Sequence, residues 1–330
     1  MKIAIVGAGW LGCHIAHKLK KDLHDVTIFD KSDIFNGSSF FNQNRLHKGF
    51  HYSRNQKTRK LCYETFELFL KDYSEVVESI KNNFYIVPKD KSLIDFGTFR
   101  SIFFHEEIPF IETPISCFRN VDGSVIVDEK YIDPIKSKNF FKKHLSDNLI
   151  IREITSFDLD KLSAEYDYVI NVTNNMLQSI DKCYFELSLT LIYEKLVNTE
   201  FDSITMIDGP LFSIYPYHDN KYTITDVEYT PLYTSNIISD VLQYQNTINH
   251  TVINNIRSKI EDKIQYYYGG FKTHFEYKSY YTSIKVKRKS ESAERYPIIT
   301  KHDNIISCVT GKIQGIYILE DFIKNEIINR

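Results

Sequence analysis

Residues 1–30 of the chain read MKIAIVGAGWLGCHIAHKLKKDLHDVTIFD. The apolar run 2–6 predicts a β-strand, the glycines that follow it predict a tight turn, and the next segment predicts a helix. A second strand is expected at 26–29, and Asp30 stands at its end. Strand, glycine turn, helix and strand in this order predict the start of a Rossmann-like dinucleotide-binding fold.

Each part of the GxGxxG turn has a predicted role. The first glycine makes the turn, the second lets the backbone approach a pyrophosphate, and the third lets the helix pack closely on the strand. The helix N-terminus would face the phosphates, and the Asp30 carboxylate would accept the ribose hydroxyls. A βαβ unit without a ligand is the alternative. The residues predicted to contact the dinucleotide in this stretch are Gly7, Gly9, Trp10, Leu11, Gly12, Asp30 and Lys31.

Composition limits the functional classes. A formal net charge of -2 over 330 residues gives no electrostatic footprint for nucleic acid or anionic lipid. The five cysteines are scattered without metal-ligand spacing, which predicts free thiols in a reducing compartment and no metal site. The first residues are a predicted sheet strand, and no apolar run approaches the length of a membrane span. We expect a soluble, cytoplasmic protein with a small-molecule substrate.

Later segments alternate between α/β and β-rich character. Helices are predicted over 58–82, over 132–145 and over most of 237–266, and strands over 84–87, 93–96 and 124–127. The region 149–172 returns to an α/β pattern, 187–227 predicts an antiparallel sheet, and 305–329 predicts strand, glycine turn and helix. This order predicts a discontinuous cofactor domain interrupted by β-rich insertions.

Five motifs, in this order along the chain, carry a resemblance to a known family. They are VGAGWLG at 6–12, NQNRLHKGFHYSRN at 42–55, YVINVTNN at 168–175, MIDGPLFSIYPY at 206–217 and VTGKIQG at 309–315. Together they resemble FAD-dependent oxidoreductases of the D-amino-acid oxidase superfamily, and within it the branch associated with surface-carbohydrate biosynthesis. The resemblance implies a cofactor domain of residues 1–82, 145–180 and 296–330, and a mostly antiparallel substrate domain of residues 83–144 and 181–295. It also implies FAD bound in an extended form, with adenine near Asp30 and the isoalloxazine at the domain interface.

This chain departs from the family pattern at two places. Asp30 stands where the superfamily more often has Glu, so the ribose would be reached by a shorter side chain. The middle strand ends in Asn171-Val172-Thr173-Asn174 in place of the usual Ala-Thr-Gly, which weakens the expected close approach of this turn to the flavin nucleotide. Thr173 is still the residue that the resemblance places against the cofactor.

The loop 42–52 is dense in hydrogen-bond donors. A long polar loop inside a compact domain is usually functional, and Arg or Lys donors suit the N1–C2=O edge of a flavin that accepts hydride. By the resemblance, Asn42 and Arg45 would contact the cofactor, and His47 and His51 would bind substrate or transfer protons. Alternatively, Arg45 binds backbone carbonyls and the histidines are ordinary loop residues.

Three further segments carry predicted site residues. Ser213 and Tyr215 alternate with apolar residues and so share one face of a predicted strand, which the resemblance places near the flavin. By the resemblance, Arg295 matches the position at which related oxidases hold an arginine near the cofactor or a substrate carboxylate. The turn residues Gly311, Lys312 and Ile313 would lie under the pyrimidine end of the flavin. The alternative for Ser213 and Tyr215 is a strand with a structural role only. For Arg295 it is an exposed basic face, and for residues 311–313 it is a plain turn.

The leading hypothesis is an FAD-dependent oxidoreductase, an oxidase or a dehydrogenase. It would transfer a hydride from a C–N or C–O bond of a small substrate, for which a sugar-derived molecule is one candidate, to flavin N5. FAD is favoured over NAD because a nicotinamide dehydrogenase usually keeps its nucleotide domain contiguous. The alternatives are a non-redox flavoenzyme such as a sugar-nucleotide mutase, and a degenerate cofactor-binding protein without catalysis.

Overall fold

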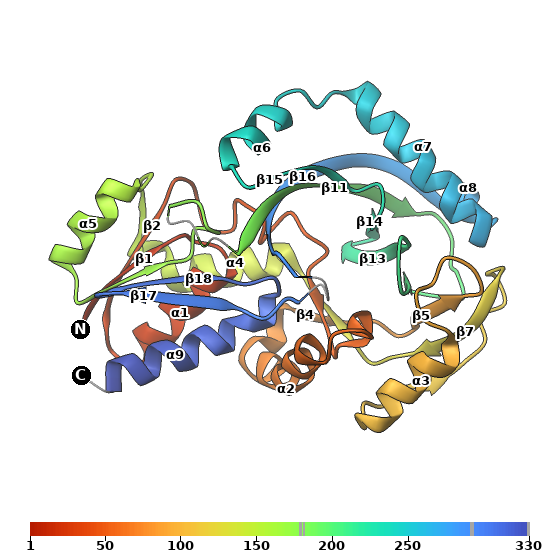
Figure 1. The fold of residues 1–330 in the computed structure, drawn as a ribbon, viewed down its shortest axis with the longest axis horizontal. Helices are drawn as coiled ribbons and strands as arrows, with labels where there is room; N and C mark the ends of the chain where they lie inside the picture. Colours follow the sequence, from red (N-terminus) through yellow and green to blue (C-terminus); the bar gives the residue numbers. More distant parts are fainter. Residues whose placement is uncertain (178–179, 181, 291–293, 329–330) are drawn as a thin grey trace. The chain divides into compact units, whose positions relative to one another are not determined.

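The chain folds into two compact units, each assembled from separate stretches of sequence. The structure is a computed structural model that describes residues 1–177, 180, 182–290 and 294–328. Unit 1 comprises residues 1–41, 134–185 and 285–330, and unit 2 comprises residues 42–133 and 186–284. Figure 1 shows the ribbon coloured along the sequence, so that red, yellow-green and blue segments meet in the sheet of unit 1.

Unit 1 is built on a six-stranded sheet in the order β17-β18-β10-β1-β2-β9. Four neighbouring pairs are parallel and only β17 runs antiparallel to β18. The strands are β1 (Lys2–Val6), β2 (Asp25–Asp30), β9 (Leu149–Ile151), β10 (Tyr168–Asn171), β17 (Ile298–His302) and β18 (Ile305–Val309). Strands buried on both faces read as continuous apolar runs, which explains the unbroken IAIV of β1.

Helices cover both faces of this sheet. On one face, Ala4 and Val6 of β1 pack with Leu159 and Leu162 of α5. On the other face, α1 packs against α9 and α4 (Figure 1). The helices are α1 (Trp10–Lys21), α4 (Pro134–Leu145), α5 (Ser156–Glu165) and α9 (Ile316–Ile328), with 3-10 turns η3 (Ser146–Asn148) and η4 (Ile313–Gly315). This is the predicted Rossmann-like layer structure.

Unit 2 contains a nine-stranded mixed sheet in the order β15-β11-β14-β13-β12-β5-β7-β6, with β16 also paired to β11. Pairs β11/β14, β13/β14, β12/β13, β5/β7 and β6/β7 are antiparallel, and β12/β5 is parallel. The strands are β5 (Asn83–Pro88), β6 (Ile111–Glu112), β7 (Val121–Ile126), β11 (Cys183–Lys195), β12 (Ser203–Met206), β13 (Phe212–His218), β14 (Lys221–Asp226), β15 (Pro231–Ser235) and β16 (Phe275–Arg288). The predicted fold class, a parallel cofactor sheet with a mostly antiparallel second sheet, is confirmed.

The core of unit 2 lies between this sheet and its helices. Ile260 and Ile264 of α7 pack with Leu191, Ile214 and Ile224 of the sheet. A second cluster joins Phe99 and Phe103 of α3 to β5 and β7. The helices are α2 (Gln56–Tyr73), α3 (Phe96–His105), α6 (Ile238–Gln245), α7 (His250–Tyr267) and α8 (Phe271–His274), with 3-10 turns η1 (Phe50–Tyr52) and η2 (Ser74–Val76). A small sheet, β3 (Arg45–Leu46), β8 (Lys130–Ile132) and β4 (Val77–Ser79), holds the polar loop.

Two predicted elements differ from the structure. The helix expected over 58–82 ends at Tyr73, because residues 77–79 pair with β8 as strand β4. The strand expected over 93–96 is absent, because the Asp95 carboxylate accepts the N–H of Thr98 at 2.8 Å and caps α3. In both places a strand partner or a helix cap, and not the local apolar spacing, decided the backbone conformation.

The two units also divide the chain differently from the predicted domains. Residues 42–82 group with unit 2, because β3 and β4 both pair with β8. Residues 134–144 group with unit 1, where the ring of Phe141 lies 5.1 Å from that of Trp10 on α1. Residues 285–295 also fall in unit 1 as far as the structure describes them. Unit 1 is nevertheless discontinuous, with three separate stretches.

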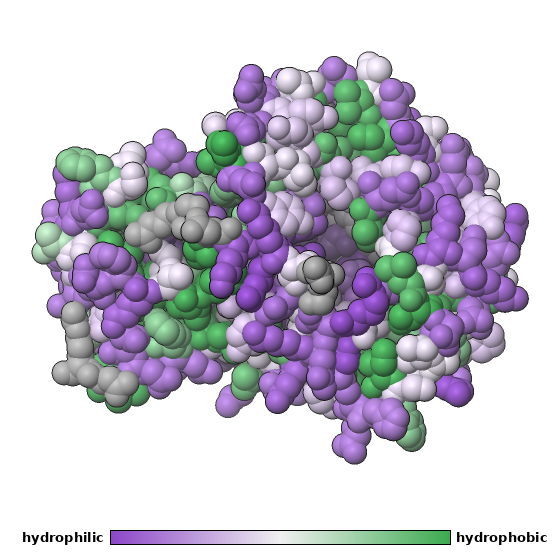
Figure 2. Space-filling view, in the orientation of Figure 1, coloured by the Kyte–Doolittle hydropathy of each residue, from purple (hydrophilic) through white to green (hydrophobic). Residues whose placement is uncertain are grey.

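The surface and the cysteines carry no sign of a membrane segment or a disulfide. In the described ranges, every helix is too short or too polar to cross a bilayer. The face drawn in Figure 2 mixes hydrophilic and hydrophobic side chains. All five cysteines are free thiols.

A buried charge cluster around Glu320 ties α1 to α9. Nε2 of His14 lies 2.9 Å from Oε2 of Glu320, and Nζ of Lys324 and of Lys18 lie 2.6 Å and 3.8 Å from Oε1. Burial by itself would raise the pKa of Glu320. Hydrogen bonds from His14 and Lys324 and the charges of His14 and Lys18 outweigh burial and lower this pKa from 4.5 to about 2.

Glu320→Gln is expected to lower the free energy of unfolding at neutral pH by up to about 3 kcal/mol, because a carboxylate with a depressed pKa stabilises the folded state. That stabilisation is complete above the ordinary pKa of 4.5 and is lost as the pH falls to about 2. Denaturant unfolding of both proteins across this pH range tests it. The difference between them should shrink on acidification, and a difference that does not change with pH contradicts the prediction.

Candidate cofactor and active site

The glycine turn of unit 1 has the geometry that its sequence predicts. Gly7 has φ +112°, and a Cβ at this position would lie 2.9 Å from the carbonyl oxygen of Val172. A Cβ on Gly12 would lie 1.8 Å from the carbonyl oxygen of Gly7. The helix therefore starts so close to the end of β1 that only glycine fits at both positions.

The N-terminus of α1 has no capping side chain from its own N-cap residue. Helix α1 has no side chain on its N-cap Gly9 and no acidic residue in its first turn. A Cβ on Gly9 would fill the space in front of the turn, 2.7 Å from Oγ of Ser39, which accepts the N–H of Trp10 at 2.9 Å. The first N–H groups of a helix lack intrahelical acceptors, and the helix dipole favours negative charge there. This donor set fits a pyrophosphate.

Asp30 lies at the end of β2 beside this turn. Its Oδ2 accepts the N–H of Ala8 at 2.7 Å, and its Oδ1 accepts the N–H and hydroxyl of Ser32 at 2.9 Å and 3.1 Å. A carboxylate has about four acceptor sites, so Asp30 can hold the turn and still accept a hydroxyl. Next to it Lys31 is exposed, and Leu11 is half-buried. The Trp10 ring is used in packing against Phe35 and Phe141.

The turn after β10 is held by its own side chains. Asn171 Oδ1 accepts the hydroxyl and the N–H of Thr173 at 2.7 Å and 3.2 Å. Asn171 Nδ2 donates to Oγ of Ser307 on β18 at 3.2 Å. The polar ending that departs from the family pattern therefore braces two neighbouring strands at their carboxyl ends.

Arg295 and the C-terminal glycine turn lie together in unit 1. A Cβ on Gly311 would lie 2.6 Å from Cδ and 3.2 Å from Cα of Arg295. Oγ1 of Thr310 donates to the carbonyl of Lys312 at 2.8 Å. The turn differs from the predicted helix N-terminus in one respect. Ile313–Gly315 forms the 3-10 turn η4, and α9 begins only at Ile316.

Arg45 is a buried cation in unit 2, 8% exposed. Its Nη1 donates to Oγ1 of Thr205 at 2.8 Å, its Nη2 donates to Oε1 of Gln43 at 2.9 Å, and its guanidinium lies 4.1 Å from the ring centroid of Tyr215. In the described part of the chain, Nε has no hydrogen-bond acceptor and no carboxylate lies within ion-pair distance. Ser213 also donates to Gln43, at 3.2 Å, so Ser213 and Tyr215 face the same loop.

His47 lies in a buried polar cluster. The cluster includes the carboxylate of Glu129, which was not predicted from the sequence. Nδ1 of His47 lies 3.4 Å from both Oη of Tyr85 and Oε2 of Glu129. The Tyr85 hydroxyl donates to Oε2 of Glu129 at 2.7 Å. Burial, and then the charge of Glu129, raise the pKa of Tyr85, while Arg45 opposes the rise. The His51 ring lies 5.9 Å from the His47 ring and is less buried.

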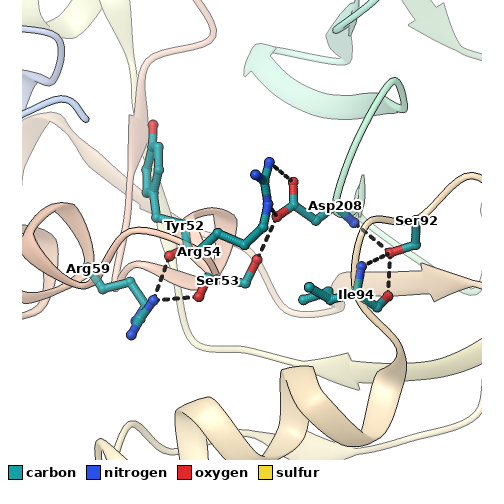
Figure 3. A network of polar contacts seen from close by, with 7 residues as sticks. All are labelled: Tyr52, Ser53, Arg54, Arg59, Ser92, Ile94 and Asp208. Atoms are coloured by element: carbon teal, nitrogen blue, oxygen red, sulfur yellow. Dashed lines mark hydrogen bonds and ion pairs between the residues drawn. The ribbon is translucent and has the colours of Figure 1, made fainter. Parts of the chain in front are cut away.

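Polar contacts anchor the segment after His51 (Figure 3). Asp208, from the MIDGPLF motif, accepts Oγ of Ser53 at 2.9 Å and Nη2 of Arg54 at 3.1 Å. Nη1 of Arg59 donates to the carbonyls of Tyr52 and Ser53 at 2.9 Å and 2.6 Å. The motifs at 42–55 and 206–217, which are far apart in the sequence, are therefore joined within unit 2.

A second histidine–carboxylate pair was also not predicted from the sequence. Nδ1 of His218, at the end of β13, lies 2.7 Å from Oδ2 of Asp133, whose side chain is 4% exposed. Nε2 of His218 lies 3.4 Å from Oδ2 of Asp219. A register shift between Pro216 and His218 interrupts the strand alternation. No local sequence pattern predicts this irregularity, on which the direction of the His218 ring depends.

The predicted site residues thus fall into two groups. Asn42, assigned to the cofactor together with the glycine turn, lies in unit 2, where its carbonyl accepts the Tyr281 hydroxyl at 3.0 Å. The group in unit 1 is Gly7, Gly9, Trp10, Leu11, Gly12, Asp30, Lys31, Thr173, Arg295, Gly311, Lys312 and Ile313. The group in unit 2 is Asn42, Arg45, His47, His51 and Tyr215.

Comparison with known proteins supports the resemblance. Residues 2–90 match the DAO family model, which is described as FAD dependent oxidoreductase. The chain is 29% identical over 326 residues to the FAD-dependent monooxygenase FPY4 of Fusarium mangiferae, with 96% of this chain and 88% of that protein covered. It is 26% identical over 355 residues to the FAD-dependent monooxygenase kojA of Aspergillus flavus, with 96% and 83% covered.

Solved structures share the fold across the whole chain. Glycine oxidase from Geobacillus kaustophilus superposes with a TM-score of 0.71 at 12% identity, covering 100% of this chain and 94% of that one. NikD, an unusual amino acid oxidase, superposes with a TM-score of 0.72 at 9% identity, covering 97% and 91%. At such identities the likeness shows the fold alone.

The comparisons therefore support an FAD-dependent oxidoreductase, with the DAO family model matched by residues 2–90. The protein is an enzyme, and its cofactor is FAD. The predicted cofactor and enzyme class are confirmed. The predicted link to surface carbohydrate is not supported by these relatives and stays a prediction.

Gly12→Ala is expected to destabilise the protein by about 3 kcal/mol or more and to reduce bound FAD, because the new Cβ meets a backbone oxygen that cannot rotate away. Gly37→Ala is the matched control, since no atom lies within 4 Å of a Cβ there. Melting temperature and flavin content after purification measure both effects. Equal behaviour of the two variants would show that the close helix start is not needed.

Proposed function

We propose that this enzyme oxidises a small substrate by hydride transfer from a C–N or C–O bond to FAD. The observation that carries the proposal is the glycine turn of unit 1, with a helix N-terminus whose N-cap is Gly9 and with Asp30 beside it, in a chain with a DAO-type fold. When bound, FAD supplies the hydride acceptor, and the protein supplies binding, orientation and proton handling.

Unit 1 would hold the cofactor through its backbone and a few side chains. The N-terminus of α1 and the space in front of Gly9 suit the pyrophosphate, and Asp30 suits the ribose. Thr173 is assigned to the same cofactor, as are Gly311, Lys312 and Ile313 of the C-terminal turn. Arg295, packed against Gly311, would add positive charge for the flavin or for a substrate anion.

Unit 2 would supply the groups that bind substrate and move protons. Arg45 is the strongest candidate, because a buried guanidinium without a paired carboxylate is costly unless an electron-rich group binds it. Tyr215 lies under its face, and burial followed by the charge of Glu129 raises the pKa of Tyr215, so this phenol stays a hydrogen-bond donor. His47 and His51 are assigned to substrate binding or proton transfer.

A monooxygenase is the second candidate function. The supporting observation is that FPY4 and kojA, which align over 96% of this chain, are named FAD-dependent monooxygenases. The two reactions differ in the fate of oxygen. A simple oxidase releases hydrogen peroxide, and a monooxygenase leaves one oxygen atom of O2 in the product.

The substrate class rests on the sequence resemblance. A sugar-derived molecule is the class we propose first, and amino acids are the comparison class because glycine oxidase and NikD share the fold. A sugar-nucleotide mutase would isomerise its substrate without net oxidation, and a degenerate cofactor-binding protein would bind FAD and react with nothing.

Anaerobic titration of the purified holoprotein tests the proposal directly. We expect a flavin absorption spectrum that bleaches with a sugar-derived or amino-acid substrate, and that returns when oxygen is admitted. Hydrogen peroxide and incorporation of 18O2 then separate oxidase from monooxygenase. A protein that cannot be loaded with FAD, or a flavin that no substrate of either class reduces, overturns the proposal.

Asp30→Ala is expected to weaken FAD binding about 10- to 100-fold, because a hydrogen bond to a charged group contributes roughly 1.5–3 kcal/mol. Asp33→Asn is the matched control in the same loop, since the Asp33 carboxylate pairs with Lys142 at 2.5 Å. Titration of FAD into each apoprotein, followed by flavin fluorescence, gives the affinities. Unchanged affinity in Asp30→Ala would remove Asp30 from the cofactor site.

A further inference from the structure

A pocket of about 330 Å³ lies in unit 2, lined by residues of helices α7 and α8 and of strands β11 and β16. Figure 1 shows these two helices beside the two strands. The volume falls within the range of about 300 to 1,000 Å³ that is typical of small-molecule sites. None of the residues assigned above to cofactor or substrate lines this pocket, so the proposed function does not account for it.

One wall of the pocket is aromatic. It includes Tyr193 of β11, Phe271 of α8 and Phe275 of β16, whose exposed fractions are 1%, 0% and 2%. The Tyr193 ring lies 5.3 Å from the ring of Phe271 and 5.6 Å from that of Tyr277, which also lines the pocket. Because these rings are packed against one another, a ligand meets a fixed apolar surface against which an aromatic ring packs well.

Four charged side chains also line the pocket, and the two carboxylates among them already have close donors. Oε1 of Glu261 accepts the Tyr193 hydroxyl at 2.7 Å, and Oε2 of Glu276 accepts Nζ of Lys278 at 2.6 Å. Burial, and then the hydrogen bond to Glu261, raise the pKa of Tyr193, so the phenol keeps the proton that it donates.

The two cations of the pocket have no such close partners. Nε of Arg257 lies 3.5 Å from Oε1 of Glu261 and is buried without a hydrogen bond. Nζ of Lys272 lies 3.8 Å from Oε2 of Glu261 and 3.7 Å from Oδ1 of Asp262. Within the described ranges, these long contacts are the only ion pairs of either cation. The unused hydrogen-bonding capacity of the charged groups is therefore that of donors.

The guanidinium of Arg257 is held in one orientation. It lies 4.3 Å from the ring centroid of Tyr277, and the side chain is 30% exposed. A guanidinium that is already stacked on a ring loses less freedom when it binds a ligand. Since Nε is buried, the donors left to a ligand are the two Nη groups, and two N–H groups side by side match the two oxygens of a carboxylate.

We propose that this pocket binds a small aromatic carboxylate. Its ring would pack on the wall of Tyr193, Phe271 and Phe275, and its carboxylate would bind Arg257, with Lys272 as the second cation. The observation that carries the proposal is the aromatic wall beside two cations that lack close carboxylate partners. The inference goes beyond the proposed function, because it requires no particular substrate or reaction at the flavin.

Isothermal titration calorimetry of the FAD-loaded protein with 2-naphthoate tests the proposal. We expect saturable binding that weakens as the salt concentration rises, because part of the affinity is charge attraction at a partly exposed site. Naphthalene-2-carboxamide has the same ring without the charge and should bind at least about 10-fold more weakly. Equal affinity of the acid and the amide, or no binding of the acid, overturns the proposal.

Arg257→Gln should weaken the binding of 2-naphthoate about 10- to 100-fold, because it removes the charged group that the carboxylate binds. Lys259→Gln is the matched control, since it removes the same charge from an exposed position of the same helix that does not line the pocket. Its affinity should stay within about twofold of the wild type. An equal loss in both variants, or no loss in Arg257→Gln, overturns the proposal.

Lys272→Gln gives a second readout that does not depend on the packing of Arg257. The Lys272 side chain is 47% exposed, so its replacement leaves the folded state intact. We expect the affinity for 2-naphthoate to fall about 2- to 5-fold, the effect of an exposed ion pair. If Arg257→Gln does not fold, an unchanged affinity in Lys272→Gln overturns the proposal by itself.

Discussion

The close start of α1 on the end of β1 is the constraint on which unit 1 depends. Because Gly12 lies against the carbonyl of Gly7, α1 begins directly after the end of β1. Its N-terminal N–H groups follow the N-cap residue Gly9. The same approach brings the turn after β10 to within 2.9 Å of a Cβ at position 7, so β1 and β10 end at one level. Asp30 and Thr173 then lie at the carboxyl ends of parallel strands, where open α/β sheets bind their ligands.

In unit 2, buried charged side chains hold the polar loop in place, where in unit 1 close backbone packing holds the glycine turn. The polar loop has little regular structure of its own, and contacts with charged side chains hold it and the segment that follows. Glu129 binds the backbone of the 48–49 turn, Asp208 binds Arg54, and Glu106 pairs with Arg59. Arg45 differs from these residues, because its charged group meets only neutral oxygens and an aromatic face. Among the described residues, Arg45 is therefore a buried cation without a carboxylate partner, the arrangement expected of a binding group.

Local patterns predicted unit 1 well and unit 2 only in outline. The GxGxxG spacing, the apolar β1 and Asp30 are contiguous in sequence, so their arrangement follows from strand and helix geometry. Glu129 could not be found in this way, because in the run Asp128-Glu129-Lys130 it looks like part of an exposed turn. Only its partners, about 45 to 80 positions away, make it a buried acceptor. Likewise, the Asp95 cap was present in the sequence, but the apolar residues beside it favoured a strand.

The sequence by itself predicted the class of the enzyme and its cofactor, because five motifs in order resemble one family. It also predicted the glycine turn, because the close start of a helix on a strand demands glycine at set spacings. Only the tertiary structure decided which distant side chains share a site. It placed residues 42–82 with unit 2 and brought Glu129 to His47. Strand pairing and buried hydrogen bonds join residues without regard to their separation along the chain.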